Sequence, residues 1–244
     1  MTVRTVTAAG VVSTLVTSPT FTASSVGAIY DAAADGNGNL FVAGIQTPNG
    51  GGLIMQVVIS TGVVSQFAGV GTLSTMVDGP VSSATFNRPS GIVVGPDGAV
   101  YVADCNINAP TGYYPKIRRI ASGAVTTIAT FSLPSSTGWN QVAFRLAMDP
   151  VTQNIYVSFF YGHQIWKVPS TGGGTYGTPV FMAGGGTLVS ATTTGMNSPG
   201  SSDGTGSNAG FQRPNGMALD ASGNVWIADQ NNNRIRGGRM RHRV

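Results

Sequence analysis

Two stretches of nineteen residues, 86–104 (FNRPSGIVVGPDGAVYVAD) and 211–229 (FQRPNGMALDASGNVWIAD), are nearly the same sequence written twice. They align without a gap, 125 residues apart, and eight of the nineteen positions are identical. Most of the other positions exchange residues of similar size and polarity. Self-similarity of this kind indicates a structural unit that is repeated along the chain and stacked on its own copies. Any fold for this chain must therefore be built from such units.

The same pattern recurs with less identity at residues 28–44 (AIYDAAADGNGNLFVAG) and 142–159 (VAFRLAMDPVTQNIYVSF). Each copy has an apolar or β-branched run on either side of a turn rich in Asp, Gly and Asn, which predicts a β-hairpin. Two alternating runs follow, as in residues 115–131 (PKIRRIASGAVTTIATF), and predict a second pair of strands. Four antiparallel strands per unit, repeated about a centre, are the plan of a β-propeller blade.

We expect one propeller domain over residues 1–236, followed by a basic tail at 237–244. The blades are expected at about residues 27–70, 84–131, 140–184 and 209–236. Residues 3–16 (VRTVTAAGVVSTLV) resemble the outer strand pair at 117–129 (IRRIASGAVTTIA), so the stretch 3–17 is predicted to complete the last blade. Completion in this way would hide a sheet edge. The alternatives are that the chain is an excerpt of a larger propeller, or that it closes the propeller through self-association.

The composition favours an all-β chain. It has 35 glycines, two lysines and no glutamate, so it lacks the residues from which surface helices are commonly built. Five of its thirteen basic residues lie in the last eleven positions, and the rest of the chain is near neutral, which argues against nucleic-acid binding. No apolar run approaches the roughly 20 residues that span a membrane. No signal peptide is visible, yet the low charge and the abundant Ser, Thr and Gly favour an extracellular or cell-surface protein.

The unit F-x-R-P-x-G, followed by G-x-V-(Tyr/Trp)-(Val/Ile)-A-D and (Lys/Arg)-I-R, resembles the NHL repeat of NHL-type β-propellers. The lead-in stretches 78–89 (DGPVSSATFNRP) and 203–214 (DGTGSNAGFQRP) extend this resemblance. It is strong in two copies, weaker in the other two, and covers essentially the whole chain. The resemblance implies a propeller fold, and the number of repeats predicts about four blades. NHL propellers include binding scaffolds and a few lyases and hydrolases, so it implies no single activity.

Several polar residues recur at equivalent places of the repeat and are predicted to be structural. Asp104 and Asp229 each end the second strand of a unit, where a carboxylate can accept backbone N–H bonds from the loop that follows. Arg88 and Arg213 are predicted to pack blades or to tether loops. Cys105 is the only cysteine, so it forms no disulfide within the chain, and it is predicted to be a small buried residue.

One region departs from the repeat and is the predicted ligand-binding surface. His163 is the only histidine outside the tail, and the aromatic residues Phe160, Tyr161 and Trp166 lie close to it in sequence. Aromatic faces stack on sugars and apolar ligands, and aromatic residues are enriched at protein-binding hot spots. No catalytic constellation is recognised. We therefore expect a non-catalytic binding or assembly scaffold that presents its loops to a protein or glycan partner.

Two other functions remain open from the sequence. The resemblance extends to calcium-dependent lactonases, which hold a metal in the central channel with carboxylate and Asn side chains. A hydrolase of this kind would bind calcium through the channel candidates Asp31, Asn87, Asn140 and Asn215. Those enzymes commonly use a Glu ligand, which this chain does not contain. The second alternative is a structural component of an extracellular filament or surface layer.

Overall fold

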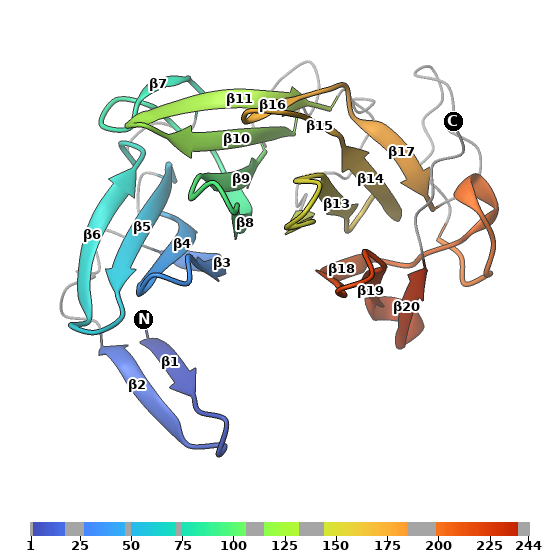
Figure 1. Cartoon of the computed structure of the whole chain (residues 1–244), viewed down its shortest axis with the longest axis horizontal. Helices are drawn as coiled ribbons and strands as arrows, with labels where there is room; N and C mark the ends of the chain where they lie inside the picture. The colour runs from blue at the N-terminus through green and yellow to red at the C-terminus, as the bar shows by residue number, and fades with distance from the viewer. Residues whose placement is uncertain are drawn as a thin grey trace.

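The computed structural model describes residues 2–17, 27–46, 50–71, 75–105, 115–131, 144–184 and 199–238. This part of the chain is all-β, and four antiparallel sheets are arranged as the blades of a propeller (Figure 1), which confirms the predicted fold class. Its helical segments are the short 3₁₀ turns η1 (Gly206–Asn208) and η2 (Gln230–Asn232). Among the described residues, none of the helices has the length and apolar character that crossing a membrane requires.

Each blade is a sheet whose strands follow one another in chain order from the inside outward. Blade 1 contains β3 (Ala28–Ala34), β4 (Asn39–Ile45), β5 (Gly52–Val58) and β6 (Val63–Ala68). Blade 2 contains β8 (Pro89–Val94), β9 (Val100–Asp104), β10 (Lys116–Ala121) and β11 (Ala124–Thr130), with the short β7 (Gly79–Pro80) added beyond β11. Blade 3 contains β12 (Phe144–Met148), β13 (Ile155–Phe159), β14 (Gln164–Val168) and β17 (Val180–Ala183). A small hairpin of β15 (Ser170–Gly172) and β16 (Thr175–Tyr176) precedes β17. Blade 4 contains β18 (Pro214–Leu219), β19 (Val225–Asp229) and β20 (Arg234–Gly238).

Local turn chemistry explains why the first two strands of a blade form a hairpin. In blade 1 the carboxylate of Asp35 accepts the backbone N–H groups of Asn37 and Asn39, at 2.7 and 3.0 Å. Gly36, which lies between Asp35 and Asn37, has a φ of 73°, a conformation that glycine adopts without steric cost. The longer turn of blade 3 places Gln153 in the same left-handed region, with a φ of 58°. The predicted turns therefore form, one of them without glycine.

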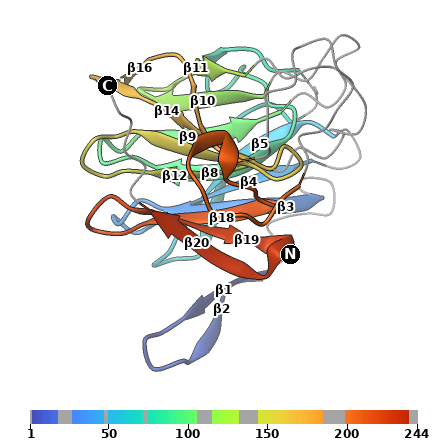
Figure 2. The same cartoon turned by 90° about the vertical axis from the view of Figure 1, so that its right-hand side faces the viewer.

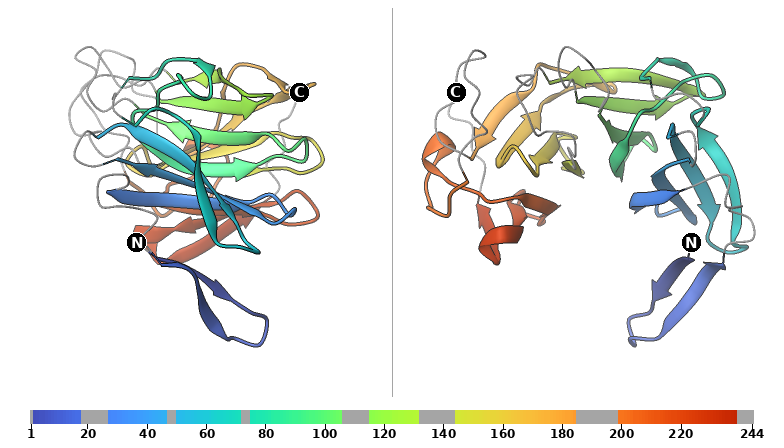
Figure 3. Two further views of the ribbon diagram at one scale, coloured as in Figure 1. Left: turned by 90° about the vertical axis from the view of Figure 1, so that its left-hand side faces the viewer. Right: turned by 180° about the vertical axis from the view of Figure 1, so that it is seen from behind.

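The blades stand around a common centre, with the strands β3, β8, β12 and β18 innermost (Figure 1). Neighbouring inner strands contact one another in chain order: β3 with β8, β8 with β12, and β12 with β18. In Figure 2 the strands of successive blades run across the view in layers. Figure 3 shows that the described blades form an arc that is open between blade 4 and the N-terminal hairpin.

Each of the first three blades packs one side, which we call the forward face, against the blade that follows. Three apolar clusters lie at these junctions. The forward-face residues that the blades share are an aromatic residue of the second strand (Phe41, Tyr101 and Tyr156) and an isoleucine of the third strand (Ile54, Ile117 and Ile165). All six are buried, with at most 5% of their surface exposed. The repeated units therefore bury equivalent side chains at successive blade junctions.

The N-terminal strands differ from the prediction. β1 (Thr2–Val6) pairs with β2 (Val12–Thr17), and in the described residues neither strand pairs with blade 4. A tight turn joins them, in which the N–H of Gly10 bonds to the carbonyl of Thr7 at 2.9 Å. Val16 of β2 packs against blade 1. Pairing across a short turn has a lower loop-closure cost than pairing with the far end of the arc. Blade 4 is therefore three-stranded in the described residues.

Candidate functional site

A buried arginine joins three segments of blade 2. Arg118, on β10, has no exposed surface, and its guanidinium lies 2.7 Å from Asp78 and 3.2 Å from Asp104. It also donates to the carbonyl oxygens of Thr85 and Val77, at 3.1 and 2.9 Å. The five donors of a guanidinium suit it to such a junction, because each partner is held in a defined direction. Arg118 therefore ties the lead-in segment to the strands of the blade.

Asp104 is fully buried beside this arginine. Its carboxylate accepts the backbone N–H groups of Asn87 and Arg88, at 3.1 and 2.9 Å. Burial raises the pKa of Asp104 to about 6, although Arg118 and these donors favour the charged form. Its predicted structural role is confirmed, but the donors belong to the loop that enters the blade rather than the loop that follows. Cys105 is buried as predicted, and burial together with the Asp104 charge raises its pKa to about 12.

Blade 4 repeats the network. Arg236 occupies the position of Arg118, since Arg236 pairs with the second strand as Arg118 does. Its guanidinium lies 2.8 Å from Asp203 and 3.3 Å from Asp229, which take the places of Asp78 and Asp104. The difference is exposure: the Asp203 side chain is 94% exposed, whereas that of Asp78 is 45% exposed. The blade 4 network thus has both of the carboxylates that blade 2 has, but the Asp203 carboxylate is exposed to solvent.

His163 lies where blade 3 meets blade 4, and it is 7% exposed. Its Nδ1 accepts the backbone N–H of Arg213 at 3.0 Å. Burial lowers the pKa of His163, and the charge of Arg213 lowers it further. Arg213 is an exposed residue, and its guanidinium lies over two rings, 5.6 Å from the centre of Phe160 and 5.4 Å from that of Tyr161. His163 is therefore a buried tether, and the neighbouring exposed group is an arginine with two half-buried aromatic rings.

Trp166 has a different environment from the other predicted ligand-binding residues. It packs against Phe131, Phe159 and Phe181, with ring centres 5.7 to 6.5 Å apart. By strand register, Trp166 and Phe159 occupy the positions that Arg118 and Asp104 hold in blade 2. Blade 3 thus replaces the polar network by an aromatic cluster. The structure groups Phe160 and Tyr161 with Arg213, and groups Trp166 with the core.

A second arginine–aromatic pair lies at the junction of blades 1 and 2. Arg88, the repeat equivalent of Arg213, lies 5.4 Å above the ring of Tyr30. Arg145 of blade 3 donates to the backbone carbonyl of Ser90 in blade 2. The contact of Arg88 fits its predicted tethering role, and Arg145 makes a second contact across a blade junction.

The three described channel candidates for calcium take part in bonds within the protein. Asp31 is half-buried and accepts the N–H of Ile92, from blade 2, at 3.2 Å, and burial raises its pKa. Asn87 is 2% exposed, and the side chain of Asn215 donates to a neighbouring glutamine at 3.0 Å. Asn140 lies outside the described residues. In the part of the chain that the structure describes, no group of three or more acidic, His or Cys side chains could hold a metal ion.

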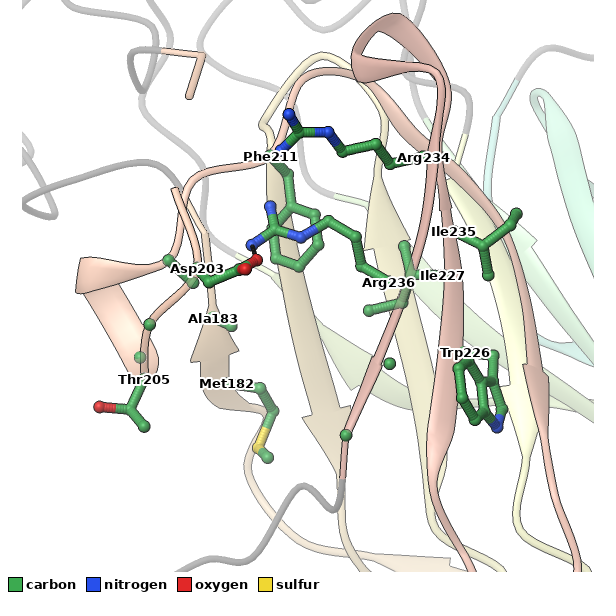
Figure 4. A pocket seen from close by; sticks show the side chains of 15 residues that line it. Met182, Ala183, Asp203, Thr205, Phe211, Trp226, Ile227, Arg234, Ile235 and Arg236 are labelled. Atoms are coloured by element: carbon green, nitrogen blue, oxygen red, sulfur yellow. Dashed lines mark hydrogen bonds and ion pairs between the residues drawn. The ribbon is translucent and has the colours of Figure 1, made fainter. Parts of the chain in front are cut away.

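A pocket of about 730 Å³ lies along β20, at the outer edge of blade 4. Figure 4 shows Arg236, Phe211 and Asp203 on one side of this strand, and Ile235 and Trp226 on the other. The far wall of the pocket is the lead-in segment 203–206, with Met182 of blade 3 below it. The lining thus combines a strand edge, an arginine–carboxylate pair and apolar side chains.

Sequence reasoning did not identify the arginine–carboxylate networks or this pocket. The signals were present, because the two lead-in stretches begin with the same Asp-Gly pair and both third strands contain Ile-Arg. The sequence alone does not show that these two signals belong to one contact, because Asp78 and Arg118 are 40 residues apart. A pairing rule that linked the first residue of the lead-in to the arginine of the third strand would have found both networks.

The comparisons with known proteins agree with the repeat and the fold. A family profile described as "Teneurin NHL domain" matches residues 61–237. Teneurin-1 of Caenorhabditis elegans is 28% identical over 183 residues, which is 70% of this chain and 6% of that protein. The chain therefore spans only a small part of the curated relative that it matches.

Two solved structures share the architecture at low identity. An auxiliary nutrient binding protein from Bacteroides thetaiotaomicron superposes with a TM-score of 0.63 and 14% identity, over 93% of this chain and 46% of that one. A chain of a nidogen/laminin complex superposes with a TM-score of 0.59 and 14% identity, over 96% and 65%. These likenesses support the fold, and the profile covers most of the repeats. The chain belongs to the teneurin NHL-domain family.

Proposed function

We propose that this chain is a non-catalytic binding scaffold, located outside the cell or at its surface, that engages a protein partner. The observation that carries the proposal is the exposed residue Arg213, whose guanidinium lies over the rings of Phe160 and Tyr161. Arginine and tyrosine are enriched among the residues that dominate protein interfaces. Because the two rings preorganise the arginine, a partner can contact it at a small entropic cost.

The relatives support this kind of function rather than a particular partner. The family is that of a teneurin domain, and one fold neighbour comes from a nidogen/laminin complex. The described channel residues suggested for a calcium-dependent hydrolase, Asp31, Asn87 and Asn215, already bond to the protein, as Asp31 does to blade 2. A scaffold needs only a rigid surface, which the buried networks and junctions of the blades supply.

The surface can be tested by screening the chain against an array of extracellular protein domains and against a glycan array. The test variant is Phe160→Ala with Tyr161→Ala, which removes both rings under Arg213. The control is Val151→Ser, which removes an 87% exposed apolar residue from the turn at the other end of β13. We expect protein ligands that bind the original chain and the control but not the double variant.

Three results would overturn the proposal. Protein ligands that bind all three chains equally would exclude this surface. Hits confined to glycans would assign a different class of partner. Calcium-stimulated hydrolysis of a lactone panel, together with a higher melting temperature in calcium than in chelator, would replace the scaffold by an enzyme.

A further inference from the structure

The two ends of the propeller are distinct, because its inner strands run in the same direction. The carboxylate of Asp31, the fourth residue of β3, accepts the N–H of Ile92, the fourth residue of β8, at 3.2 Å. The hydroxyl of Ser90, the second residue of β8, donates to the carbonyl of Phe144, the first residue of β12, at 3.2 Å. A bond between β13 and the start of β18 continues the series. The inner strands therefore begin at one end of the propeller, the entry end, and their hairpin turns project at the other, the turn end (Figure 2).

The entry end has no exposed carboxylate. The chain has nine acidic residues, all aspartates, and the structure describes each of them. Asp104 and Asp229 end the second strands at the entry end and have no exposed surface. Asp31 is half-buried within β3. The others lie in the hairpin turns (Asp35, Asp97, Asp149 and Asp220) or beside the arginines of the third strands (Asp78 and Asp203).

Basic residues gather at the entry end. Arg88 and Arg213 each precede the proline that begins an inner strand. Lys116 and Arg234 begin the third strands of blades 2 and 4. Arg213 and Arg234 are exposed, and the other two are half-buried. The segments between the described ranges contain no charged residue, so the entry end carries a positive charge that no exposed carboxylate cancels.

The turn end has the opposite balance. Arg119 and Lys167 lie there, and Arg119 pairs with a turn carboxylate at 2.9 Å. Against these two bases stand the four turn aspartates, one in each blade. Hydrogen bonds from Asn224 and Trp226 lower the pKa of one of them, Asp220, to about 2, so that it stays charged in neutral solution. The charges of the described blades are thus segregated between the two ends, and such segregation steers a partner of opposite charge to one of them.

Arg213 is suited to bind a carboxylate. Its guanidinium lies over the rings of Phe160 and Tyr161, which carry no charge and therefore orient the arginine without neutralising it. Arg88 has the same arrangement over Tyr30, 5.4 Å from the ring centre. A guanidinium presents its N–H groups in one plane and pairs with a carboxylate through two parallel hydrogen bonds. The side chains of Asp and Glu are thus the protein groups that match both arginines.

We propose that the partner of the Arg213 surface contacts the entry end through a protein segment rich in Asp and Glu, and that Arg213 and Arg88 pair with its carboxylates. The inference rests on the proposed function, because it names the chemistry of the partner that the scaffold engages. It assigns the contact to the entry end, since the turn aspartates repel carboxylates from the turn end.

The probe is a short labelled peptide of alternating Glu and Gly, titrated with the 244-residue chain and followed by fluorescence anisotropy. We expect saturable binding that weakens as the salt concentration rises from about 25 to about 300 mM, because contacts between exposed charges are screened. Arg213→Gln and Arg88→Gln should each weaken binding about three- to fivefold. A peptide with Gln in place of Glu should not bind.

The matched control is Lys167→Gln, which removes the same charge from the turn end and should bind the peptide within about twofold of the original chain. Arg213 is an exposed residue, so Arg213→Gln should keep the melting temperature of the original chain. The Gln peptide leaves the protein unchanged and tests the charge of the ligand independently.

The inference fails if the Glu peptide shows no saturable binding, if the Gln peptide binds equally well, or if Lys167→Gln weakens binding as much as Arg213→Gln. Binding of a heparin oligosaccharide without binding of the Glu peptide would assign the entry end to sulfated glycans instead. Hits on the protein array that are lost in the double variant of Phe160 and Tyr161, yet bind through segments without Asp or Glu, would reject this inference and keep the scaffold.

Discussion

Blades 2 and 4 have the most similar sequences in the molecule and the most different surroundings. The forward-face residues Tyr101 and Ile117 of blade 2 are fully buried, whereas their equivalents in blade 4, Trp226 and Ile235, are 45% and 70% exposed. The arginine–carboxylate network is nevertheless formed in both blades. The polar network is thus an internal property of one blade, whereas apolar burial depends on the neighbouring blade.

This difference separates two contributions to the free energy of folding: polar contacts within one blade and apolar burial between neighbouring blades. A blade sequence alone determines hydrogen bonds between its own strands and lead-in segment, because all partners lie within about 40 residues. The hydrophobic contribution requires a second sheet to exclude water from the forward face. Equivalent substitutions in the two blades should therefore have different effects, and each pair of variants below measures one contribution.

The largest losses of stability are expected for the two arginines. Arg118→Met leaves the fully buried Asp104 without its charged partner and should lower the free energy of unfolding by about 3–5 kcal/mol. Arg236→Met also leaves a fully buried carboxylate, that of Asp229, without its charged partner. Its cost should be somewhat smaller, about 2–3 kcal/mol, because the Arg236 side chain is already 12% exposed. The Asp229 carboxylate also keeps the donors of Gln212 and Asn232, at 2.7 and 2.8 Å. Urea unfolding of both variants checks this order. Equal losses would mean that the exposure of blade 4 has no energetic consequence.

The isoleucines of the third strands test the apolar contribution alone. Ile117→Ala creates a cavity at the junction of blades 2 and 3 and should cost about 2–4 kcal/mol. Ile235→Ala, at the equivalent position of blade 4, should change stability by less than about 0.5 kcal/mol. Urea midpoints at unchanged m-values provide the comparison. A large loss in Ile235→Ala would show that blade 4 is covered in solution.

The sequence predicted the part of the structure that each repeat forms locally. The hairpin turns, the four-stranded blades and the structural role of Asp104 all follow from residues close together in the chain or repeated at a constant spacing. The resemblance of residues 3–16 to an outer strand pair was also detected. The strands of that pair bond to each other, but whether the pair also joins blade 4 depends on contacts in space, which the pattern alone does not decide.

The candidate site was less predictable, because equivalent positions exchange chemical roles between blades. Trp166 was grouped with Phe160 and Tyr161 by its place in the sequence, yet it occupies the position of Arg118 and packs in the core. His163 is a predicted ligand-binding residue, and its Nδ1 accepts a backbone bond from Arg213, a contact that the sequence did not indicate. A single sequence shows where a blade departs from the repeat, but it does not show whether the changed residues pack in the core or lie at the surface.

A smaller difference is expected for two glycines of the inner strands. A Cβ on Gly91 would lie 2.7 Å from the carbonyl oxygen of Phe144 in blade 3, whereas a Cβ on Gly216 meets nothing within 4 Å. Gly91→Ala should therefore cost about 1–3 kcal/mol through displacement of backbone at the junction. Gly216→Ala should be neutral, or stabilising by a few tenths of a kcal/mol. Thermal melting of the pair checks this, and equal behaviour would contradict the close approach at the blade 2 junction.

The smallest effect concerns the acceptor of one backbone bond. The N–H of Arg88 donates to the Asp104 carboxylate, whereas the equivalent N–H of Arg213 donates to His163. Burial lowers the pKa of His163, so the unfolded chain binds its proton more readily than the folded chain. The contribution of His163 is therefore present above about pH 6.5 and is lost as the pH falls through the folded pKa.

His163→Asn keeps a side-chain acceptor, tolerates the left-handed backbone at this position (φ of 55°) and does not titrate. Between pH 7 and pH 5, the melting temperature of the original chain should fall by about 2 °C more than that of the variant. The raised pKa of Asp104 acts in the opposite direction, since acid then favours the folded chain, but it is common to both proteins and cancels in their difference. Parallel pH profiles would show that protonation of His163 does not compete with its bond to Arg213, and that blade 4 is tethered in another way.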